Sequence, residues 1–410
     1  MATPSVADLA TKARRELLEN ILPFWRERTV DHGRGGFIAE MSNDLQVRPE
    51  AGKGLILNAR ILWTFSAAAR FTNDPADRAL ADRAYNYLVE KFLDRDHGGY
   101  FWELDPAGNV VDATKKIYGQ AFCAYALGEY HRAFDDPAAL QHAIDVFRLI
   151  ESESRDQKHG GYWEALSRDW QPIEDVRLSD KDMNERKSMN THLHVLEGYA
   201  NLYRVWPDEE LKAQLLELIA GFFTHIIDHQ TNHFHHFFDD EWTPRSDSNT
   251  FGHDIEGSWL LCEAALAVGH ESTLATVRKA AVRIARTVLD EGVDCDGGLF
   301  YEGRNGRIID SNKEWWPQAE AVVGFLNAFQ ISQDEAFLEA AGRCWDFIEG
   351  HIIDRAHGEW FWRVDRHGKP DPLEPKVSMW KCPYHNGRAC LEIVGRALAI
   401  RGSQPTEEPS

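Results

Sequence analysis

A glycine-aromatic signature recurs along the chain about every 62 residues, and this repeat constrains the fold more than any other feature. The copies begin at Gly35, Gly98, Gly160, His233, Gly297 and Gly358. The copy at His233 has lost its glycines, and it divides a double-length step between its neighbours nearly in half. Six units of one kind therefore fill the chain.

Each copy opens a short alternating apolar run that ends in turn residues, such as Arg304-Asn305-Gly306. This pattern predicts a β-hairpin. Two helical stretches lie between successive hairpins. One begins at a proline, as at Pro75 and Pro137, and the other follows the hairpin directly and is rich in apolar and small residues, as in 121–130. The second kind suits a helix that is buried on several sides.

Six helix pairs, each with its more apolar member after the hairpin, predict an all-α fold. We expect an (α/α)6 barrel, with six inner helices, six outer helices and short β-hairpins between the helix pairs. A linear helical solenoid is the alternative, but solenoid repeats usually have ~34 to ~47 residues. Residues 1–401 are expected to form a single domain, and residues 402–410 a disordered C-terminal tail. In such a ring, the junctions between hairpins and inner helices face one common cavity.

Composition limits the choice of partners. Of the 410 residues, 45 are Lys or Arg and 66 are Asp or Glu, so the net charge is −21. Nucleic acids and anionic membrane surfaces are bound through clustered basic residues, so we expect neither as a partner. No stretch is apolar for long enough to cross a bilayer. The first twenty residues lack the apolar core of a secretory signal, and the six cysteines form no C-x-x-C pair, so a cytoplasmic location is expected.

The starts of the predicted inner helices are rich in polar, aromatic and imidazole side chains. The residues concerned are Arg60, Tyr118, Asn190, His194, His253, Glu256, Trp316, Trp380 and His385. A helix end that only caps a core would carry Ser, Asp or Thr instead. Three separate units each place an imidazole near the start of the predicted inner helix, and this coincidence favours a functional site. A charged insertion at 167–187, which contains Asp182, precedes the third inner helix and is a candidate lid.

Several histidines have a structural interpretation. His192 is expected to be structural, because residues two apart on a helix point in different directions and His194 takes the cavity side. Glu256 follows His253 by one helical turn, so it is predicted to hydrogen-bond that imidazole and orient it. The histidine-rich run 233–236 lacks the spacing that would complete a metal site, and no phosphate-binding glycine motif is present. We therefore expect no metal and no cofactor.

Aromatic platforms and uncharged polar groups in a deep cavity suit a carbohydrate, whose ring stacks on tryptophan while its hydroxyls form hydrogen bonds. Glycoside hydrolysis needs two carboxylates roughly 5 to 10 Å apart, and the junctions offer no evident pair. Histidine can take and return a proton near neutral pH. Two histidines on opposite walls could remove a proton from a carbon next to a carbonyl and return it to the other face, which is epimerisation.

Five separated segments carry a family resemblance. They are residues 58–63, 188–197, 251–256, 315–321 and 383–388. In this order they resemble the cellobiose 2-epimerases of the N-acylglucosamine 2-epimerase superfamily, and the likeness extends over about 17–399. The last segment, Pro-Tyr-His-Asn-Gly-Arg, is more similar to the disaccharide epimerases than to the N-acylglucosamine branch.

The resemblance implies an (α/α)6 barrel, no external cofactor, and reversible inversion at C2 of the reducing-end glucose of β-1,4-linked disaccharides. Cellobiose would give glucosyl-mannose and lactose would give epilactose, through ring opening and a cis-enediolate. By position it implies an acid/base pair, His253 and His385, with Glu256 orienting His253 and His194 polarising substrate oxygens. The substrate-binding residues that it implies are Arg60, Tyr118 and Asn190 at the enediolate, Trp316 and Trp380 at the two sugar rings, and Asp182 at a hydroxyl.

Other functions fit part of the pattern. An aldose-ketose isomerase or a mannose or N-acylglucosamine epimerase of the same superfamily would share the imidazole pair. A six-hairpin glycosidase would depend on carboxylates, and a non-catalytic sugar-binding module would leave three converging imidazoles unexplained. The expected partner is a small-molecule disaccharide, and the expected state is a monomer, with a homodimer as the alternative.

Overall fold

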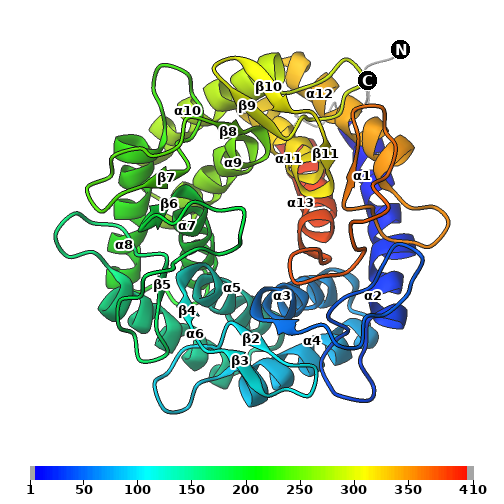
Figure 1. Ribbon diagram of the computed structural model, residues 1–410. Coiled ribbons are helices and arrows are strands. Elements are labelled where there is room, and N and C mark those ends of the chain that lie inside the picture. Colours follow the sequence, from blue (N-terminus) through cyan, green and yellow to red (C-terminus); the bar gives the residue numbers. More distant parts are fainter. Residues whose placement is uncertain (1–4, 404–410) are drawn as a thin grey trace.

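The computed structural model describes residues 5–403, and its helices form two concentric rings (Figure 1). The inner ring consists of α3 (Leu55–Thr72), α5 (Ile117–Phe134), α7 (Met189–Tyr203), α9 (Phe251–Val268), α11 (Trp315–Ser332) and α13 (Tyr384–Ser403). The outer ring consists of α4 (Pro75–Tyr87), α6 (Pro137–Leu149), α8 (Glu209–Gly221), α10 (Glu271–Glu291) and α12 (Glu335–Phe347), with α1 (Val6–Glu16) and α2 (Leu22–Arg28) together in the sixth place. The predicted all-α (α/α)6 barrel with short β-hairpins is confirmed.

The burial of the two rings follows their sequence patterns. Every residue of α3 from Leu55 to Ala69 is buried, because this helix is covered on all sides. In α10, by contrast, the buried residues recur at helical spacing on one face, from Val277 to Val288. Outer helices α4 and α6 begin at Pro75 and Pro137, as the sequence predicts, and each is capped by the preceding aspartate.

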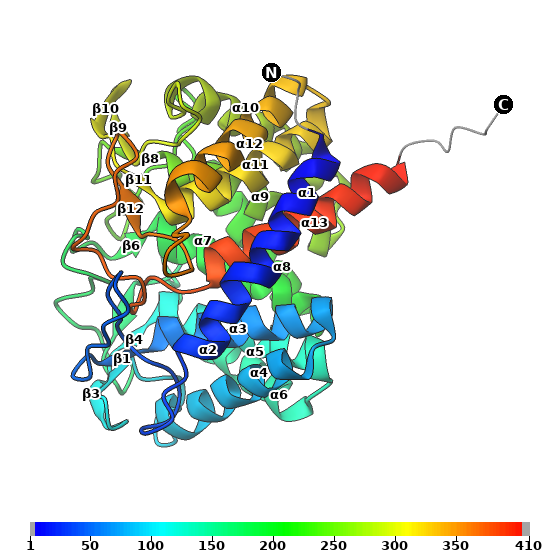
Figure 2. The same cartoon turned by 90° about the vertical axis from the view of Figure 1, so that its right-hand side faces the viewer.

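The ring is closed by segments that lie far apart in the sequence. Helix α13 packs between α11 and α3 in the inner ring, and α1 covers α13 from outside (Figure 2). Helix α13 runs to Ser403, so the first two residues of the expected tail are helical, and residues 404–410 lie outside the described part of the chain. Within residues 5–403, no helix has the length and apolarity that crossing a membrane requires.

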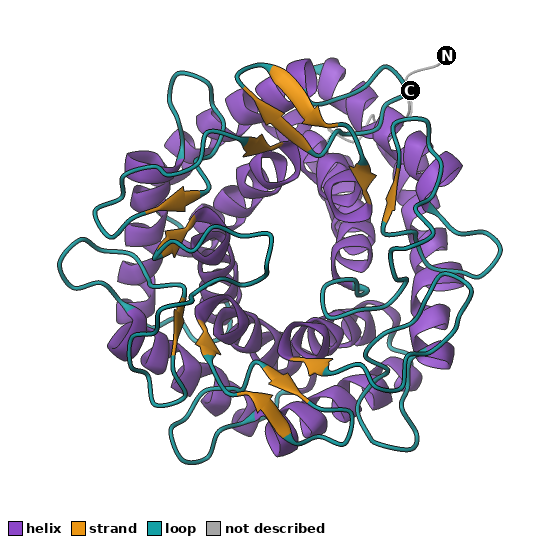
Figure 3. Cartoon of the chain, in the orientation of Figure 1, coloured by secondary structure: helices purple, strands orange, loops and turns teal. Residues whose placement is uncertain are grey.

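Short strands gather at one end of the barrel (Figures 2 and 3). They are β1 (Lys53–Gly54), β2 (Glu103–Leu104), β3 (Val110–Asp112), β4 (Lys115–Lys116), β5 (Ala165–Leu166), β6 (Lys187–Ser188), β7 (Phe237–Phe238), β8 (Asn249–Thr250), β9 (Glu302–Arg304), β10 (Arg307–Asp310), β11 (Lys313–Glu314) and β12 (Arg363–Val364). Strands β2 and β3, and β9 and β10, form antiparallel hairpins within a unit. The strand before each of the inner helices α3 to α11 pairs with a strand of the next unit, in the pairs β1–β2, β4–β5, β6–β7, β8–β9 and β11–β12. These pairings link successive units side by side.

A buried lysine-aspartate pair recurs in the units. The pairs are Lys53–Asp31 at 2.9 Å, Lys115–Asp94 at 3.0 Å, Lys187–Asp156 at 2.8 Å, Lys313–Asp294 at 3.0 Å and Lys376–Asp354 at 2.7 Å. Each aspartate begins a hairpin turn, so the pair fixes that turn against the segment that leads to the inner helix. The fourth unit has Asn249 at the position of the lysine.

The glycine signature belongs to these turns. In the third unit Gly160 and Gly161 have φ values of +72° and +75°, a region that favours glycine. The next backbone N–H, that of Tyr162, donates to Nε2 of His192 at 2.9 Å. Nδ1 of His192 lies 2.6 Å from the carbonyl oxygen of Ser188, so both ring nitrogens bond the backbone, which supports the structural role expected for this histidine. Gln120 and Gln318 bond the equivalent backbone groups in the second and fifth units.

Candidate active site

The ten residues singled out from the sequence all line one cavity of about 430 Å³. Each of the six inner helices contributes to its wall, and the segment 178–182 contributes from above the helix ends. The site positions recur because side chains three or four residues apart share one face of a helix. Asn190 and His194 are related in this way on α7, and so are His253 and Glu256 on α9.

His385, on α13, is oriented by a residue that we did not predict. Its Nδ1 lies 2.7 Å from Oε1 of Glu320 on the neighbouring helix α11, and the carboxylate accepts this hydrogen bond. The proton on Nδ1 leaves Nε2 as the basic nitrogen of the neutral ring. Burial, with the positive charges of Arg60 and Arg388, lowers the pKa of His385 well below its usual value.

Arg388 connects three buried carboxylates beneath the histidines. Its Nη2 donates to Oε1 of Glu256 at 2.6 Å and to Oε1 of Glu320 at 2.8 Å, and its Nη1 donates to Glu197. Arg388 is only 1% exposed. Because an unpaired charge in such surroundings is costly, Arg388 and the glutamates hold one another in place.

Glu256 takes a different position from the one expected. Its predicted hydrogen bond to His253 does not form, because its carboxylate is turned toward Arg388 and lies 3.8 Å from Nδ1 of His385. Burial and the nearby charge of Glu320 raise the pKa of Glu256 to about 7. Its second oxygen, Oε2, is buried and has no hydrogen-bond partner within residues 5–403. Glu256 can therefore hold or release a proton near neutral pH beside His385.

His253 is held by a hydroxyl instead. Nδ1 of His253 lies 2.6 Å from Oγ1 of Thr250, which precedes the helix by one residue. A hydroxyl can donate or accept, so this contact allows either tautomer. Burial and the charges of His236 and His194 lower the pKa of His253 well below its usual value.

The indole of Trp316 contacts both His253 and His385. Its ring centroid is 4.7 Å from that of His253 and 5.6 Å from that of His385. Its Nε1 donates to Oε2 of Glu314 at 3.0 Å, which fixes the ring. Trp315, the preceding residue on the same helix, also lines the cavity.

His194, the third imidazole, is also bound to a glutamate, which in this case lies one turn further along the same helix. Nδ1 of His194 lies 2.9 Å from Oε2 of Glu197, and its ring meets that of Tyr118 edge to face at 5.0 Å. The positive charge of Arg388 contributes to lowering the pKa of Glu197 to about 2, against the effect of burial. A permanently ionised Glu197 favours the Nδ1–H form of His194 and leaves Nε2 as an acceptor.

Polar groups of α3, α5 and α7 also line the cavity. Arg60 is 3% exposed, and its Nη2 donates to the hydroxyl of Tyr118 at 2.7 Å. Oδ1 of Asn190 is buried and has no hydrogen-bond partner in the described chain. Trp380 packs against Tyr118, with ring centroids 6.0 Å apart. This wall thus offers polar groups to a ligand beside an aromatic surface.

The predicted lid contributes a short segment to the cavity. Oδ2 of Asp182 accepts from the backbone N–H and the hydroxyl of Ser179, both at 2.8 Å, which closes a turn. Nζ of Lys116 donates to the carbonyl oxygen of Arg177 at 2.8 Å, which ties the segment to the strand before α5. Asp182 lines the cavity, and its other oxygen, Oδ1, takes no part in this turn.

Glu256, Glu320 and His385 bring their ligand atoms within 4.8 Å of one another, a spacing that could suit a metal ion. Arg388 already donates to both carboxylates, and Nδ1 of His385 donates to Glu320. These contacts engage Oε1 of both carboxylates, so the guanidinium already supplies the positive charge in this place.

Three residues of the site were not predicted, and each lies one helical turn after a residue that was predicted. Glu320 lies four residues after Trp316 and Glu197 three residues after His194, one turn deeper on the same helical face. Arg388 lies three residues after His385. The helical spacing could have found Glu197, which lies one turn from the imidazole that it binds. The partners of Glu320 and Arg388 lie on other inner helices, so spacing along one helix does not reveal them.

Three imidazoles from separate inner helices thus meet in one cavity, and the class of protein is shown by comparison with known families. The model of the N-acylglucosamine 2-epimerase (GlcNAc 2-epimerase) family matches residues 36–388. The chain belongs to this family, and the prediction of a carbohydrate epimerase is confirmed.

Individual relatives cover nearly the whole chain. A cellobiose 2-epimerase of Bacteroides fragilis is 46% identical over 388 residues, which are 94% of this chain and 99% of the relative. A cellobiose 2-epimerase of Dictyoglomus turgidum is 39% identical, over 95% of this chain and 98% of its own. The solved structure of cellobiose 2-epimerase from Bacillus thermoamylovorans has a TM-score of 0.91 at 40% identity and covers 95% of this chain and 100% of that one.

Proposed function

We propose that this protein inverts C2 of the reducing-end glucose of β-1,4-linked disaccharides, converting cellobiose to glucosyl-mannose and lactose to epilactose. The convergence of His194, His253 and His385 from three inner helices on one cavity carries the proposal. The relatives named above as cellobiose 2-epimerases support the choice of substrate.

The first step is opening of the sugar ring, which exposes the aldehyde. His194 presents Nε2 to the cavity because its Nδ1 is bound to Glu197. It polarises the oxygens of the reducing end, with the Arg60 guanidinium as a neighbouring donor. No change of net charge on the substrate is required, since one oxygen loses a proton and the ring oxygen gains one.

The second step moves the C2 proton. One imidazole of the pair His253 and His385 takes the proton from C2, and the electron pair left behind forms the cis-enediolate. The other imidazole, protonated beforehand, gives its proton to the opposite face of C2. The two rings come from different inner helices, α9 and α13, and both contact Trp316, so we place them on different sides of the substrate. The roles exchange with the direction of the reaction.

The buried carboxylates make this transfer possible. Burial favours the neutral form of both histidines, which suits a base. When His385 gains a proton, Glu320 accepts a stronger hydrogen bond from Nδ1, and Glu256 lies 3.8 Å away. Glu256 therefore stabilises the charged form of His385, in place of the orienting role at His253 expected from the sequence.

The remaining residues hold the substrate. Arg60, Tyr118 and Asn190 donate hydrogen bonds to the enediolate oxygens, and one such donor typically contributes about 3 kcal/mol to transition-state stabilisation. Trp316 and Trp380 contact the two sugar rings, and Asp182 binds a hydroxyl.

We also propose a monomer in the cytoplasm. All six cysteines are free, and five of them are buried, which suits a reducing compartment. The disaccharide is the only partner that the site requires.

The test is proton NMR of the purified protein with cellobiose in D2O. A new mannose-type reducing end that carries deuterium at C2 is expected. Free glucose would instead indicate a glycosidase, and a ketose would indicate an aldose-ketose isomerase. An unchanged spectrum with saturable binding would indicate a sugar-binding module.

A further inference from the structure

One position of the outer ring supports the glycine turns in a regular way. It lies seven residues before the aspartate that begins each hairpin turn, and it is occupied in the six units by Phe24, Tyr87, Leu149, Gly221, Thr287 and Phe347. The large side chains in this set, apart from Phe24, pack under the turn of the preceding unit. A Cβ added to Gly36 would lie 2.9 Å from Tyr87, and one added to Gly98 would lie 2.9 Å from Leu149.

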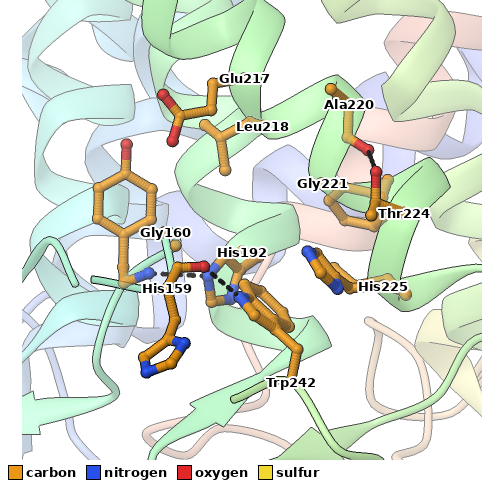
Figure 4. Close-up of a pocket in the computed structure, with 14 residues that line it drawn as sticks. His159, Gly160, His192, Glu217, Leu218, Ala220, Gly221, Thr224, His225 and Trp242 are labelled. Carbon is orange, nitrogen blue, oxygen red and sulfur yellow. Dashed lines mark hydrogen bonds between the residues drawn. The ribbon is translucent and has the colours of Figure 1, made fainter. Parts of the chain in front are cut away.

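The turn of the third unit lacks such a side chain, because the residue beside it, seven positions before Asp228 of the fourth turn, is Gly221. A Cβ added to Gly221 would meet no atom within 4 Å. A cavity of about 210 Å³ lies here, between α8 and the turn at 159–162 (Figure 4). The structure thus keeps open the space that an aromatic or aliphatic side chain occupies in four other units.

The walls of this cavity are mostly apolar and are fixed by their own contacts. Trp242 donates from Nε1 to the carbonyl oxygen of His159 at 3.0 Å, and His225 stacks on its indole at 4.7 Å (Figure 4). The ring of His192 meets the same indole at 4.8 Å. Because the indole is packed against two imidazoles, it is a poor platform for a second sugar ring.

We propose that this cavity binds a small one-ring aromatic molecule of the size and polarity of phenol. The ring would take the place that Tyr87 and Phe347 occupy in their units. An apolar protein cavity of ~150 Å³ is large enough to bind benzene, so the available volume suffices. The ligand lies against Leu218 and Gly221 and replaces the missing contacts with the turn.

The polar rim selects a hydroxyl-bearing ring over a plain hydrocarbon. In the described chain, the ring nitrogens of His225 have no hydrogen-bond partner. Burial and the charge of Lys187 lower the pKa of His225, so its imidazole is neutral and can accept from a phenolic hydroxyl at pH 7. Glu217, also at the rim, is paired with Arg155 at 2.5 Å, so its charge is balanced and the rim does not call for a charged ligand.

Phenol itself is the probe, with binding measured by calorimetry and by the shift in melting temperature. The wild-type protein should bind phenol at one saturable site, and its melting temperature should rise with phenol concentration. Gly221→Phe should weaken binding at least tenfold, and without phenol it should melt at a higher temperature than the wild type. Gly221 has helical backbone angles, φ −60° and ψ −39°, so a side chain is accommodated without strain.

Gly221→Ala is the matched control, because it gains helix propensity but leaves most of the cavity open. It should bind phenol within twofold of the wild type, and Gly221→Leu should behave like the phenylalanine variant if the latter folds poorly. Unchanged phenol affinity in both filled variants would overturn the proposal. Competition between phenol and cellobiose would also overturn it, because it would place phenol in the central cavity, as would the lack of saturable binding to the wild type.

Discussion

Glu320 accepts a hydrogen bond from Nδ1 of His385 at 2.7 Å, although the two residues lie on different inner helices and 65 residues apart in the sequence. A carboxylate in this position fixes the tautomer of the imidazole and stabilises its protonated form. The strength of the base on α13 is therefore set by α11. The first prediction tests this dependence.

Replacing Glu320→Gln should lower kcat about 10- to 100-fold while changing KM less, the usual effect of losing the partner of a reactive histidine. Removing the negative charge lowers the pKa of His385 further below its usual value, so the pH profile of kcat should shift. A titration of kcat between pH 5 and 9 measures both effects. Glu339→Gln, at an exposed position of α12, is the control and should behave as the wild type.

Replacing either member of the histidine pair should separate proton exchange from epimerisation. His253→Ala and His385→Ala should each reduce conversion of cellobiose at least 10³-fold, because a general acid or base contributes about 10² to 10⁴. Each variant keeps one base, so each should still exchange the C2 proton of one epimer with D2O. Proton NMR of cellobiose and of glucosyl-mannose, incubated separately, measures this exchange.

If a single-histidine variant exchanges both epimers equally, the two imidazoles do not act on opposite faces, and the assignment of the pair fails. His367→Ala changes an exposed turn histidine and should retain full activity.

Arg388→Met should destabilise the protein by about 3–5 kcal/mol, because three buried carboxylates lose their positive partner. In the variant the folded-state pKa values of Glu197, Glu256 and Glu320 rise above the unfolded values. Folded protein then binds more protons, so its stability should fall as the pH rises from 5 to 8. Urea unfolding at several pH values measures this slope. Arg307→Met, on the exposed strand β10, should leave the stability and its pH dependence unchanged.

His192 makes the protein sensitive to acid. Burial lowers its pKa from the usual 6.5 to about 4. Between these values the unfolded chain binds more protons, so stability is lost as the pH falls from 6.5 toward 4. Glutamine occupies the equivalent position in two other units and bonds the same backbone groups. His192→Gln should therefore reduce the stability lost between pH 7 and pH 5 by about 2 kcal/mol.

Denaturant unfolding of the wild type and of His192→Gln at both pH values checks this result. An equal loss in the two proteins would show that other groups control the acid response. Glu256, whose pKa is raised to about 7, acts in the opposite direction, because its folded state binds the proton more tightly.

The ring of helices and the position of the site at the starts of the inner helices could be predicted from the sequence, because both follow from periodic patterns. The spacing of the turns set the number of units, and the starts of the inner helices carried the imidazoles. The partner of Glu256 could not be predicted in the same way. Its spacing from His253 suggested a contact within one helix, but the guanidinium of Arg388 on another helix attracts the carboxylate more strongly. Contacts between inner helices depend on the closed ring and leave no local signal.

The cavity at Gly221 is a second feature that could not be predicted from the sequence. Glycine at this position is compatible with a helix that is exposed to solvent, and its spacing gives no sign of a cavity. Comparison of equivalent positions between units reveals it only after the turns and outer helices have been placed together.

Closure of the ring by α13 has a consequence for the growing polypeptide. Five inner helices can assemble one after another as they leave the ribosome, but His385 and Arg388 arrive with the sixth. Until then α1 lacks the helix that it covers, and Glu197, Glu256 and Glu320 face an open gap without their shared cation. Synthesis that stops short of α13 would thus yield chains without activity and with an exposed apolar seam, a form suited to recognition by chaperones and proteases.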